Sequence, residues 1–445
     1  MSQSISIQFD GAAVPHIESR HERDLAFALG WLHANDRLFQ LELARRAAAG
    51  RLAELFGPMA LASDIRARHL RLAELSDTLA GLAGADARQW LDSYARGVNA
   101  WIERRGRDLP PELRLLRAAP EPWRPRDSMA VSLIMAMELS LLPLQAKETR
   151  HTWTRTADPT LPGDLLDAAI LGTAEPGGSN AFIAHADGRA FLGNDTHLLM
   201  RLPPWWFRAH LRAPGFEVMG WTLPGFPAVI AGFNGRIAWG ITTHMLDDYD
   251  VYLEDWDEAG RTVRRGEERL AVESDEVRIR INRRESTTIT RRRTDVGPML
   301  PPDPSGALPA RSIAWTALHP GRPMDAMLTL ARARTLDEIV AAREEYVAPA
   351  MNLLACDRDG RSLFMLLGRV PDRPPALVDP RLPLDASRRE LHWRGLRDAA
   401  ANPLRRLEPG EPVVSGNDEQ LRRASAVFYP AEFDSPSRVN RMREL

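Results

Sequence analysis

Ser179 is the residue with the clearest potential for chemistry, because it follows Gly177 and Gly178 and precedes Asn180. Cutting the peptide bond before a serine frees an α-amino group, whose ordinary pKa of about 7.7–8.0 makes it a base beside the hydroxyl. Such a serine is a nucleophile without a separate histidine and aspartate. The same four residues are also typical of a turn between two elements. This pattern alone is therefore compatible with both a processing site and an ordinary loop.

An acidic loop is the second candidate site. Asp247, Asp248 and Asp250 surround Tyr249, so carboxylates alternate with a backbone carbonyl, and hard Ca²⁺ ions prefer such oxygen ligands. On spacing alone, an ordinary acidic turn is the more frequent explanation of such a loop.

Composition indicates a folded globular protein and excludes several partners. Hydrophobic residues make up 44% and charged residues 27% of the chain, as in ordinary domains. Lysine and arginine total 58 against 60 acidic residues, a net charge of -2. The only basic block, 291–293, is interpreted as solvated, so we expect neither a nucleic acid nor a membrane surface as a partner. The single cysteine, Cys356, excludes an intrachain disulfide framework.

Targeting signals are not visible in the sequence. The longest apolar stretch, 129–137, is interrupted by Ser132 and falls far short of the ~20 residues of a membrane helix, so it predicts a buried helix. The first residues show no basic region followed by an apolar stretch, which is the pattern of a secretory leader. The sequence as it stands predicts a cytoplasmic protein, or one whose leader is missing.

The elements that must position these residues fall into three segments. Residues 1–157 are predicted to be mainly helical, with a capping box at 19–22 and apolar residues at helical spacing up to Ala49. Residues 158–178 are rich in Pro, Gly, Thr and Ala and predict an exposed linker. Residues 179–445 alternate β-branched and aromatic runs with turn residues, so the fold class is α+β with layered packing. Strands are predicted at 191–192, 216–218, 228–230, 277–281 and 363–365.

Several longer motifs follow one another along the chain. The first is Gly-Trp-Leu-His-Ala-Asn-Asp-Arg-Leu-Phe-Gln-Leu-Glu-Leu at 30–43, followed by Gly-Arg-Leu-Ala-Glu-Leu at 50–55. After Ser179 come Asn-Asp-Thr-His at 194–197, Leu-Pro-Gly-Phe-Pro at 223–227 and Gly-Phe-Asn-Gly-Arg-Ile-Ala-Trp-Gly at 232–240. On these motifs, in this order, the chain resembles the penicillin acylase family of N-terminal nucleophile (Ntn) hydrolases along its whole length.

The resemblance implies a four-layer αββα core with a mainly helical N-terminal part. It also implies a precursor that cuts itself between Gly178 and Ser179, so that an α chain and a β chain beginning at Ser179 form a heterodimer. The mature enzyme would hydrolyse a small N-acyl amide through an acyl-enzyme on Ser179. The substrate classes implied are a β-lactam side chain, an acyl-homoserine lactone and an N-acyl amino acid. Trp205, Trp206 and Phe226 favour an apolar acyl group, although these aromatic residues are equally expected in a core.

Further site residues are implied by the same resemblance. The backbone N–H of Thr243 and the side-chain amide of Asn417 would bind the oxyanion. His197 would stand near the nucleophile, within hydrogen-bonding reach of Ser179, and Arg438 would support the site. Without the resemblance, Asn417 would be interpreted as a turn residue, His197 as a loop histidine and Arg438 as a solvated arginine.

One structural Ca²⁺ is implied as well. Its ligands would be the carboxylates of Asp247 and Asp250, the carbonyl of Tyr249, the side chain of Glu148 and the carbonyl of Pro380. The ion would tie the helical part to the sheet-rich part. The family habit is periplasmic or secreted.

The last residue, Leu445, lies where the family runs on into a further C-terminal portion. We therefore expect a fragment, a split protein completed by a separate C-terminal polypeptide, or a short member. The alternative to an acylase is accordingly an inactive or split fragment that needs a second polypeptide or acts only as a binding subunit.

Overall fold

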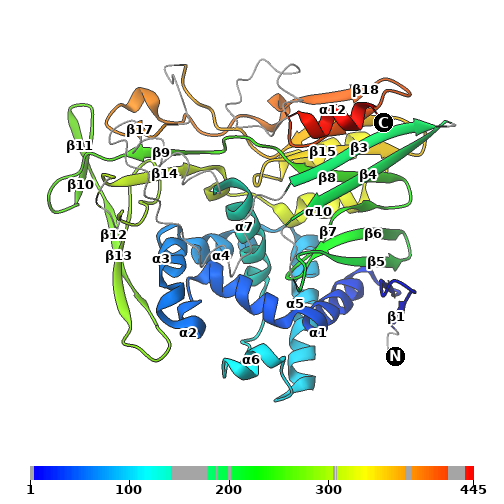
Figure 1. The fold of residues 1–445 in the computed structure, drawn as a ribbon, viewed down its shortest axis with the longest axis horizontal. Coiled ribbons are helices and arrows are strands. Elements are labelled where there is room, and N and C mark those ends of the chain that lie inside the picture. The colour runs from blue at the N-terminus through cyan, green and yellow to red at the C-terminus, as the bar shows by residue number, and fades with distance from the viewer. Residues whose placement is uncertain are drawn as a thin grey trace.

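The computed structural model describes residues 5–141, 178–186, 188–198, 202–303, 306, 308–375, 382–418 and 436–444. Helices and strands are both abundant, which confirms the α+β class (Figure 1). Within these residues no helix is both long and apolar enough to cross a lipid bilayer.

The N-terminal part is mainly helical, as predicted. Its helices are α1 (Glu22–Ala49), α2 (Ala53–Phe56), α3 (Leu61–His69), α4 (Leu72–Leu82), α5 (Ala85–Arg105), α6 (Pro111–Leu115) and α7 (Pro125–Leu141). Two short strands that the sequence pattern did not predict, β1 (Ser6–Phe9) and β2 (Pro15–Glu18), precede α1. The predicted linker lies outside the described residues, except for Gly178.

The predicted capping box at the start of α1 is wrong. The residue that caps α1 is His21, and its side chain makes no capping hydrogen bond. The Ser19 hydroxyl instead accepts the N–H of His21 at 3.3 Å, and the Ser19 N–H donates to the carbonyl of Arg212 at 3.0 Å. The Ser19 hydroxyl also donates to the carboxylate of Asp24 in the first turn of α1 at 3.4 Å. Ser19 therefore contacts the helix without capping it, and its backbone is bonded to β5 (Phe207–Ala213).

One large sheet organises the rest of the chain. It has nine strands in the order β1-β2-β5-β6-β7-β8-β15-β16-β18. The strands after β2 are β5 (Phe207–Ala213), β6 (Phe216–Leu223), β7 (Phe226–Phe233), β8 (Ile237–Thr243), β15 (Met351–Asp357), β16 (Ser362–Leu367) and β18 (Leu404–Leu407).

A three-stranded sheet in the order β19-β3-β4, here called the small sheet, faces the large one. Its strands are β3 (Gly178–Ala186), β4 (Arg189–His197) and β19 (Val413–Ser415). Outside these two sheets lie β9 (Tyr249–Leu253), β14 (Arg311–Trp315) and β17 (Leu384–Asp385), and the hairpins of β10 (Thr262–Arg265) with β11 (Glu268–Ala271) and of β12 (Glu273–Ile279) with β13 (Thr287–Arg293). The predicted strand segments fall in or overlap β4, β6, β7, β12 and β16.

The two faces of the large sheet are covered by different layers. On β15, Leu353 and Ala355 belong to the main core together with residues of α10 (Pro323–Arg332) and α11 (Leu336–Ala341). The alternate residues Leu354 and Cys356 pack with Ile183 of the small sheet. Because side chains alternate along a strand, burial on both faces gives β15 its continuous apolar run.

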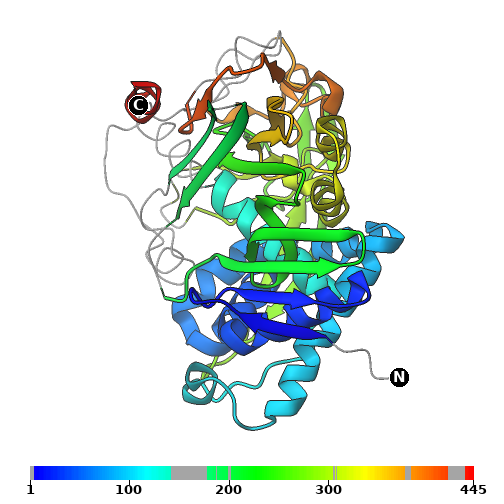
Figure 2. The same ribbon diagram turned by 90° about the vertical axis from the view of Figure 1, so that its right-hand side faces the viewer.

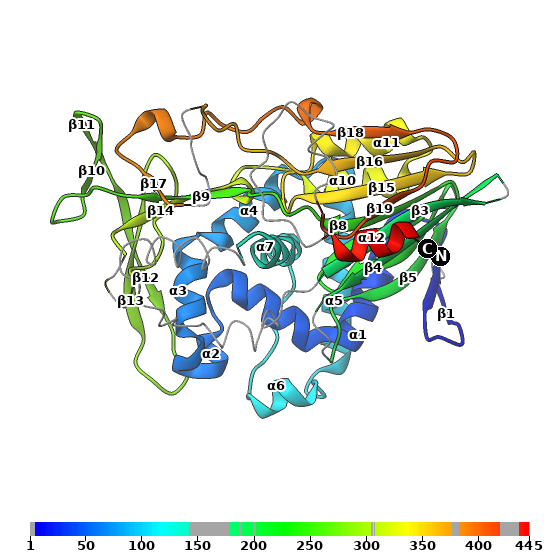
Figure 3. The same cartoon turned by 45° about the horizontal axis from the view of Figure 1, so that its top comes forward.

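A helix on the far side of the small sheet completes the layers. This helix, α12 (Ser437–Glu444), packs on β19 (Figure 3). In Figure 2 the red helix α12 and the yellow helices lie on opposite sides of the sheets. The order is therefore helix, large sheet, small sheet, helix, as the four-layer prediction requires.

Candidate active site

Ser179 lies at the start of β3, the central strand of the small sheet, where Arg438 of α12 contacts it. It is paired with Thr196 of β4 and is only 4% exposed. Its backbone N–H donates to Asn417 Oδ1 at 2.8 Å. The residue that the sequence singled out is thus a buried strand residue whose backbone is held by a side chain distant in sequence.

Asn417 follows β19 and has a left-handed backbone, with φ 64°, which asparagine tolerates better than most residues. Besides accepting from Ser179, its Oδ1 accepts a hydrogen bond from Arg438 Nη2 at 3.1 Å, while its Nδ2 donates to the carbonyl of Thr243 at 2.9 Å. Two donors at one end of the amide and an acceptor at the other fix which end is oxygen. Asn417 therefore joins the small sheet to the end of β8.

Arg438 lies in α12 and contacts the site with both terminal nitrogens. Its Nη1 donates to the carbonyl of Ser179 at 3.1 Å and to Asn180 Oδ1 at 2.9 Å. Its Nη2 donates to the carbonyl of Gly416 at 2.9 Å as well as to Asn417. The interpretation of Arg438 as a solvated arginine is therefore excluded, because the side chain links α12, β3 and the residues after β19.

A side chain at Gly178 would have to displace the side chain of His197. A Cβ on it would lie 2.4 Å from His197 Nε2 and 3.2 Å from Arg438 Nη1. His197 is paired with Gly178 across the strands, and its Nδ1 lies 3.1 Å from a carboxylate oxygen of Asp195. Strand residues alternate between faces, so His197 and Ser179 present their side chains to opposite faces of the small sheet. The structure therefore brings His197 next to Gly178, and the predicted hydrogen bond from His197 to Ser179 is not among the contacts of the described residues.

Thr243 ends β8, opposite Met351 of β15. Its carbonyl, and not its N–H, is the group that the structure shows in contact with Asn417. The N–H of Thr243 as an oxyanion donor stays a prediction.

A buried polar cluster beside Thr243 was missed by sequence reasoning. The hydroxyls of Thr242 and Ser415 lie 2.8 Å apart, and Asn352 Nδ2 donates to both, at 3.0 and 3.4 Å. All three are at most 2% exposed. They join β8, β15 and β19, so they fix the distance between the two sheets at the proposed site. The only signal for them is an asparagine inside the otherwise apolar run of β15.

Asn194 of β4 makes a second bridge between the sheets. Its Nδ2 donates to the carbonyls of Asn180 at 3.0 Å and Ile241 at 2.8 Å, and its Oδ1 accepts the Ile241 N–H at 3.0 Å. The Asn194 side chain thus makes the hydrogen bonds to Ile241 that a neighbouring strand would make to β8. These bonds are a structural role for the first residue of the Asn-Asp-Thr-His motif.

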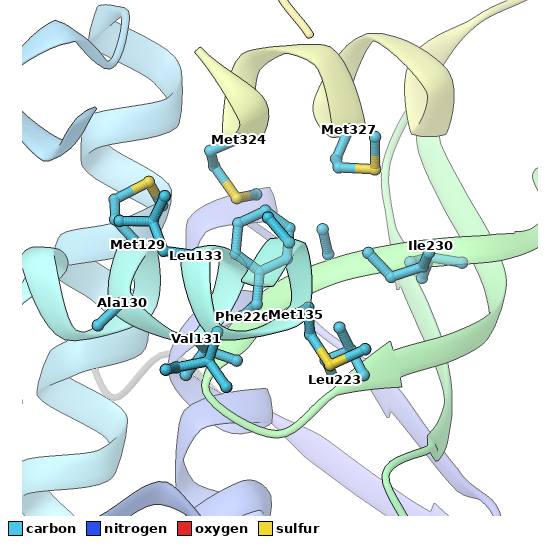
Figure 4. Packing of buried hydrophobic residues seen from close by; sticks show 14 of the residues in the cluster. Met129, Ala130, Val131, Leu133, Met135, Leu223, Phe226, Ile230, Met324 and Met327 are labelled. Atoms are coloured by element: carbon cyan, nitrogen blue, oxygen red, sulfur yellow. The ribbon is translucent and has the colours of Figure 1, made fainter. Parts of the chain in front are cut away.

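The three aromatic residues considered for an acyl pocket separate into two groups. Trp206 Nε1 donates at 3.3 Å to the carbonyl of Thr196, the strand partner of Ser179, and the Trp206 side chain is partly buried against the main core. Trp205 and Phe226 are buried in the main core. Figure 4 shows the Phe226 ring among the methionines of α7 and α10.

The acidic loop holds a buried arginine. Arg373 Nε donates to Asp250 Oδ2 at 2.7 Å, and its Nη2 donates to the carbonyls of Asp247 at 2.6 Å and Tyr249 at 3.4 Å. Trp393 Nε1 donates to the same Asp250 oxygen at 2.5 Å, and the Trp393 ring lies 5.5 Å from the guanidinium. Burial lowers the pKa of Arg373, but the charges of Asp250 and Asp247 outweigh it and leave the pKa above its ordinary value.

Two of the predicted calcium ligands, Glu148 and Pro380, lie outside the described residues. Among the described residues, no group of three or more His, Cys, Asp or Glu side chains is arranged to hold a metal ion. In the described part of the loop, the Arg373 guanidinium is hydrogen-bonded to an Asp250 oxygen and to the Tyr249 carbonyl, both predicted as calcium ligands. The calcium site stays a prediction.

The remaining aspartate of the loop links the two parts of the chain. Asp248 Oδ2 accepts hydrogen bonds from Ser140 of α7 at 2.8 Å and from Thr316 at 3.2 Å. The helical part and the loop are therefore joined directly by protein groups.

Comparisons with known proteins agree on one family. The model of the family described as penicillin amidase matches residues 4–445. The penicillin acylase 2 proenzyme of Pseudomonas sp. (strain SE83) is 30% identical, over 100% of this chain and 62% of that protein. The acyl-homoserine lactone acylase QuiP of Pseudomonas fluorescens is 27% identical, over 100% of this chain and 59% of that protein. The chain thus spans less than two thirds of the length of these relatives.

A solved structure supports the fold. The thermostable penicillin G acylase from Alcaligenes faecalis, in its orthorhombic form, superposes with a TM-score of 0.51 and 20% sequence identity. The match covers 60% of this chain and 49% of that chain. Similarity at this level concerns the arrangement of helices and strands, which agrees with an Ntn-hydrolase fold.

Proposed function

The chain belongs to the penicillin amidase family, and on that premise we propose that it cuts itself between Gly178 and Ser179 and then hydrolyses N-acyl amides with Ser179 as nucleophile. The observation that carries this proposal is the way Ser179 is held. Its N–H is bound by Asn417 Oδ1 at 2.8 Å and its carbonyl by Arg438 at 3.1 Å. A serine whose backbone is fixed on both sides is well prepared for attack on its own preceding carbonyl.

Self-cleavage is an N-to-O acyl shift. The Ser179 oxygen bonds to the carbonyl carbon of Gly178, the bond from that carbon to the Ser179 nitrogen breaks, and the hydroxyl proton moves to the nitrogen. Water then hydrolyses the resulting ester, leaving a carboxylate on Gly178 and a free α-amine on Ser179. The missing side chain at Gly178 favours this step, because a Cβ there would meet His197.

The freed amine is the base in each later turnover. It takes the hydroxyl proton of Ser179, directly or through a water molecule, while the oxygen attacks the substrate carbonyl, and water later releases the acyl group. The Asn417 oxygen that holds the Ser179 nitrogen also accepts from Arg438. A positive charge this close disfavours the ammonium form and lowers the pKa of the amine. Arg438 thereby keeps the amine unprotonated and able to accept the hydroxyl proton.

The oxyanion is assigned to Asn417 and Thr243. An amide nitrogen carries two N–H groups, and one of those on Asn417 is used by the Thr243 carbonyl, which leaves the second for the substrate. The Thr243 N–H is the other proposed donor. Each such donor is worth roughly 3–4 kcal/mol of transition-state stabilisation.

The proposed substrate is a small amide with an apolar acyl group. Two relatives are named for acting on penicillin and on acyl-homoserine lactones, and both kinds of substrate contain an N-acyl amide. Trp206, hydrogen-bonded beside Thr196, offers an aromatic surface close to Ser179.

Mass spectrometry of the purified full chain tests the maturation step. We expect a fragment whose first residue is Ser179, and none in a Ser179→Ala variant. Ser274→Ala, on the exposed strand β12, is the matched control and should process normally. An intact wild-type chain after prolonged incubation, or processing of Ser179→Ala, would contradict the proposal.

Release of free amine from a penicillin and from an acyl-homoserine lactone tests the hydrolytic step. We expect turnover by the processed protein and none by Ser179→Ala. Processing without turnover would favour the alternative, in which the chain needs a second polypeptide.

A further inference from the structure

A cationic side chain, that of Arg373, lies among the oxygens of the acidic loop. The side chain of Arg373 is 8% exposed, and those of Asp250 and Asp247 are 0% and 9% exposed. A guanidinium keeps its positive charge and has five N–H donors in a planar fork. Here the fork contacts one carboxylate oxygen and two backbone carbonyls. Anionic and carbonyl oxygens around one buried positive charge are the environment that a hard metal ion also seeks.

A calcium ion would compete with this guanidinium for oxygens of the loop. Calcium needs 6–8 oxygen ligands at roughly 2.3–2.6 Å. The Asp250 and Tyr249 oxygens that the family resemblance assigns to the ion are hydrogen-bonded to Arg373. An ion on the same oxygens would place two cations in contact inside the protein, where their repulsion is weakly screened.

The arginine is held firmly in this position. Trp393 lies against the guanidinium and donates to the same Asp250 oxygen. The backbone of the residue before Arg373 is fixed too, because the Asp372 N–H donates to the Gly395 carbonyl at 2.9 Å and the Asp372 carbonyl accepts the Arg394 N–H at 3.0 Å. Arg373 thus ties the segment after β16 to the start of β9.

Protein groups also make the connection between the helical part and the loop that a structural ion would make. Ser140 of α7 and Thr316 both donate to Asp248, which joins the helical part to the loop. We propose that Arg373 replaces a structural calcium ion in this chain, so that the loop is built around an internal cation and folds without metal. This inference does not depend on the proposed acylase activity.

The first test measures metal response in the wild-type chain. Thermal unfolding is followed after dialysis against a chelator and again in millimolar calcium, and terbium luminescence sensitised by tryptophan reports ion binding. We expect the same Tm in both solutions and no saturable luminescence. A lower Tm after chelation that calcium restores would overturn the proposal.

The second test removes the internal cation. Arg373→Ala removes the guanidinium from beside the carboxylates of Asp247 and Asp250, so we expect a lower Tm in chelator and saturable terbium binding. Calcium at about 100 times its Kd should raise the Tm of this variant by roughly 3 °C. Adding Asp250→Asn should abolish that rise. An Arg373→Ala protein that folds but ignores calcium would overturn the proposal.

Two controls complete the design. Arg373→Lys keeps a buried positive charge, so its Tm should not respond to calcium. This variant provides the test if Arg373→Ala fails to fold. A Tm of Arg373→Lys that depends on calcium as strongly as that of Arg373→Ala would overturn the proposal. Arg322→Ala removes an arginine paired with Glu345 away from this loop, and it should show no calcium response.

Discussion

Arg438 places a positive charge close to the nitrogen of Ser179, which is the proposed base. Its guanidinium shares the Asn417 oxygen with the Ser179 nitrogen, at 3.1 and 2.8 Å. In the uncleaved chain that nitrogen is a neutral amide, so the contact is purely structural. The proposed cleavage would make the same nitrogen titratable, and the neighbouring positive charge would then lower the pKa of that amine.

Arg438→Gln should shift the pH dependence of the activity. Removing the charge stabilises the ammonium form and raises the pKa of the α-amine, so the acid limb of kcat/KM moves to higher pH, by roughly one unit. A pH–rate profile of the processed variant measures this shift. Arg441→Gln, on the same helix but paired with Glu444 at its surface, is the control and should leave the profile unchanged. An unshifted acid limb in Arg438→Gln would mean that the arginine acts by position alone.

The sequence predicted some residues of the site and not others, for physical reasons. Ser179, Asn417 and Arg438 come together as the resemblance implied. His197 does not reach Ser179, because the strand register pairs it with Gly178 and turns it to the other face. Arg373 could not be foreseen, since it lies 123 positions from Asp250 and a single arginine before two prolines has no distinctive pattern.

At the scale of elements, the crossing of α1 and α5 depends on two glycines. A Cβ on Gly30 would lie 2.2 Å from the carbonyl oxygen of Tyr94, and one on Gly97 would lie 1.9 Å from that of Phe27. The obstacles are backbone atoms, which cannot move aside as a flexible side chain does. These glycines therefore set the closest approach of the helices, and Gly30 opens the first long motif of the sequence.

Gly97→Ala should destabilise the protein by about 1–3 kcal/mol, the usual range for overpacking a tight contact. Gly81→Ala in α4 is the matched control, because a Cβ there meets nothing within 4 Å. Since alanine is the better helix former, that variant should be more stable by roughly 0.5–1 kcal/mol. Urea unfolding of both variants measures the two changes. Equal effects at the two positions would show that packing at the crossing is not decisive.

Local periodicity predicted the type of most elements but not their tertiary partners. The runs rich in β-branched and aromatic residues were correctly predicted as strands. In each of them the side chains either alternate between two layers or are buried on both faces of a sheet. The cap of α1 was misplaced because Ser19 is bound to the carbonyl of Arg212, far along the chain. Asn352 likewise looks unfavourable in an apolar strand until Thr242 and Ser415 are seen beside it.

The molecule as a whole is held by one main core that runs from the N-terminal helices into the large sheet. His33 of α1 lies at the centre of this junction and is fully buried. Its ring nitrogens lie 2.9 Å from the Tyr94 hydroxyl and 3.1 Å from that of Thr222 in β6. The Tyr94 hydroxyl also accepts the N–H of Gly225 at 2.9 Å. A histidine in the first motif thus connects α1, α5 and the sheet.

This junction should make the whole fold sensitive to acid. Burial, assisted by the charge of Arg37, lowers the pKa of His33 from 6.5 to about 3. Between these values the unfolded chain binds a proton that the folded protein does not, so stability is complete above about pH 6.5 and falls as the pH drops. The slope approaches about 1.4 kcal/mol per pH unit, or roughly 2–3 kcal/mol between pH 6.5 and 4.5.

His33→Gln should weaken this acid sensitivity, because glutamine can bond both hydroxyls and does not titrate. Other buried groups contribute to the total: burial lowers the pKa of His244 to about 4, which adds to the loss, and raises that of Asp64 to about 6, which opposes it. These other groups contribute equally to the wild type and to the variant, because they lie at other sites. Their contributions therefore cancel in the difference between the two free energies of unfolding. Free energies of unfolding in urea from pH 7 to 4.5 provide the measurement. We expect the two proteins to converge as the pH falls, and parallel curves would show that His33 is not the acid-sensitive group.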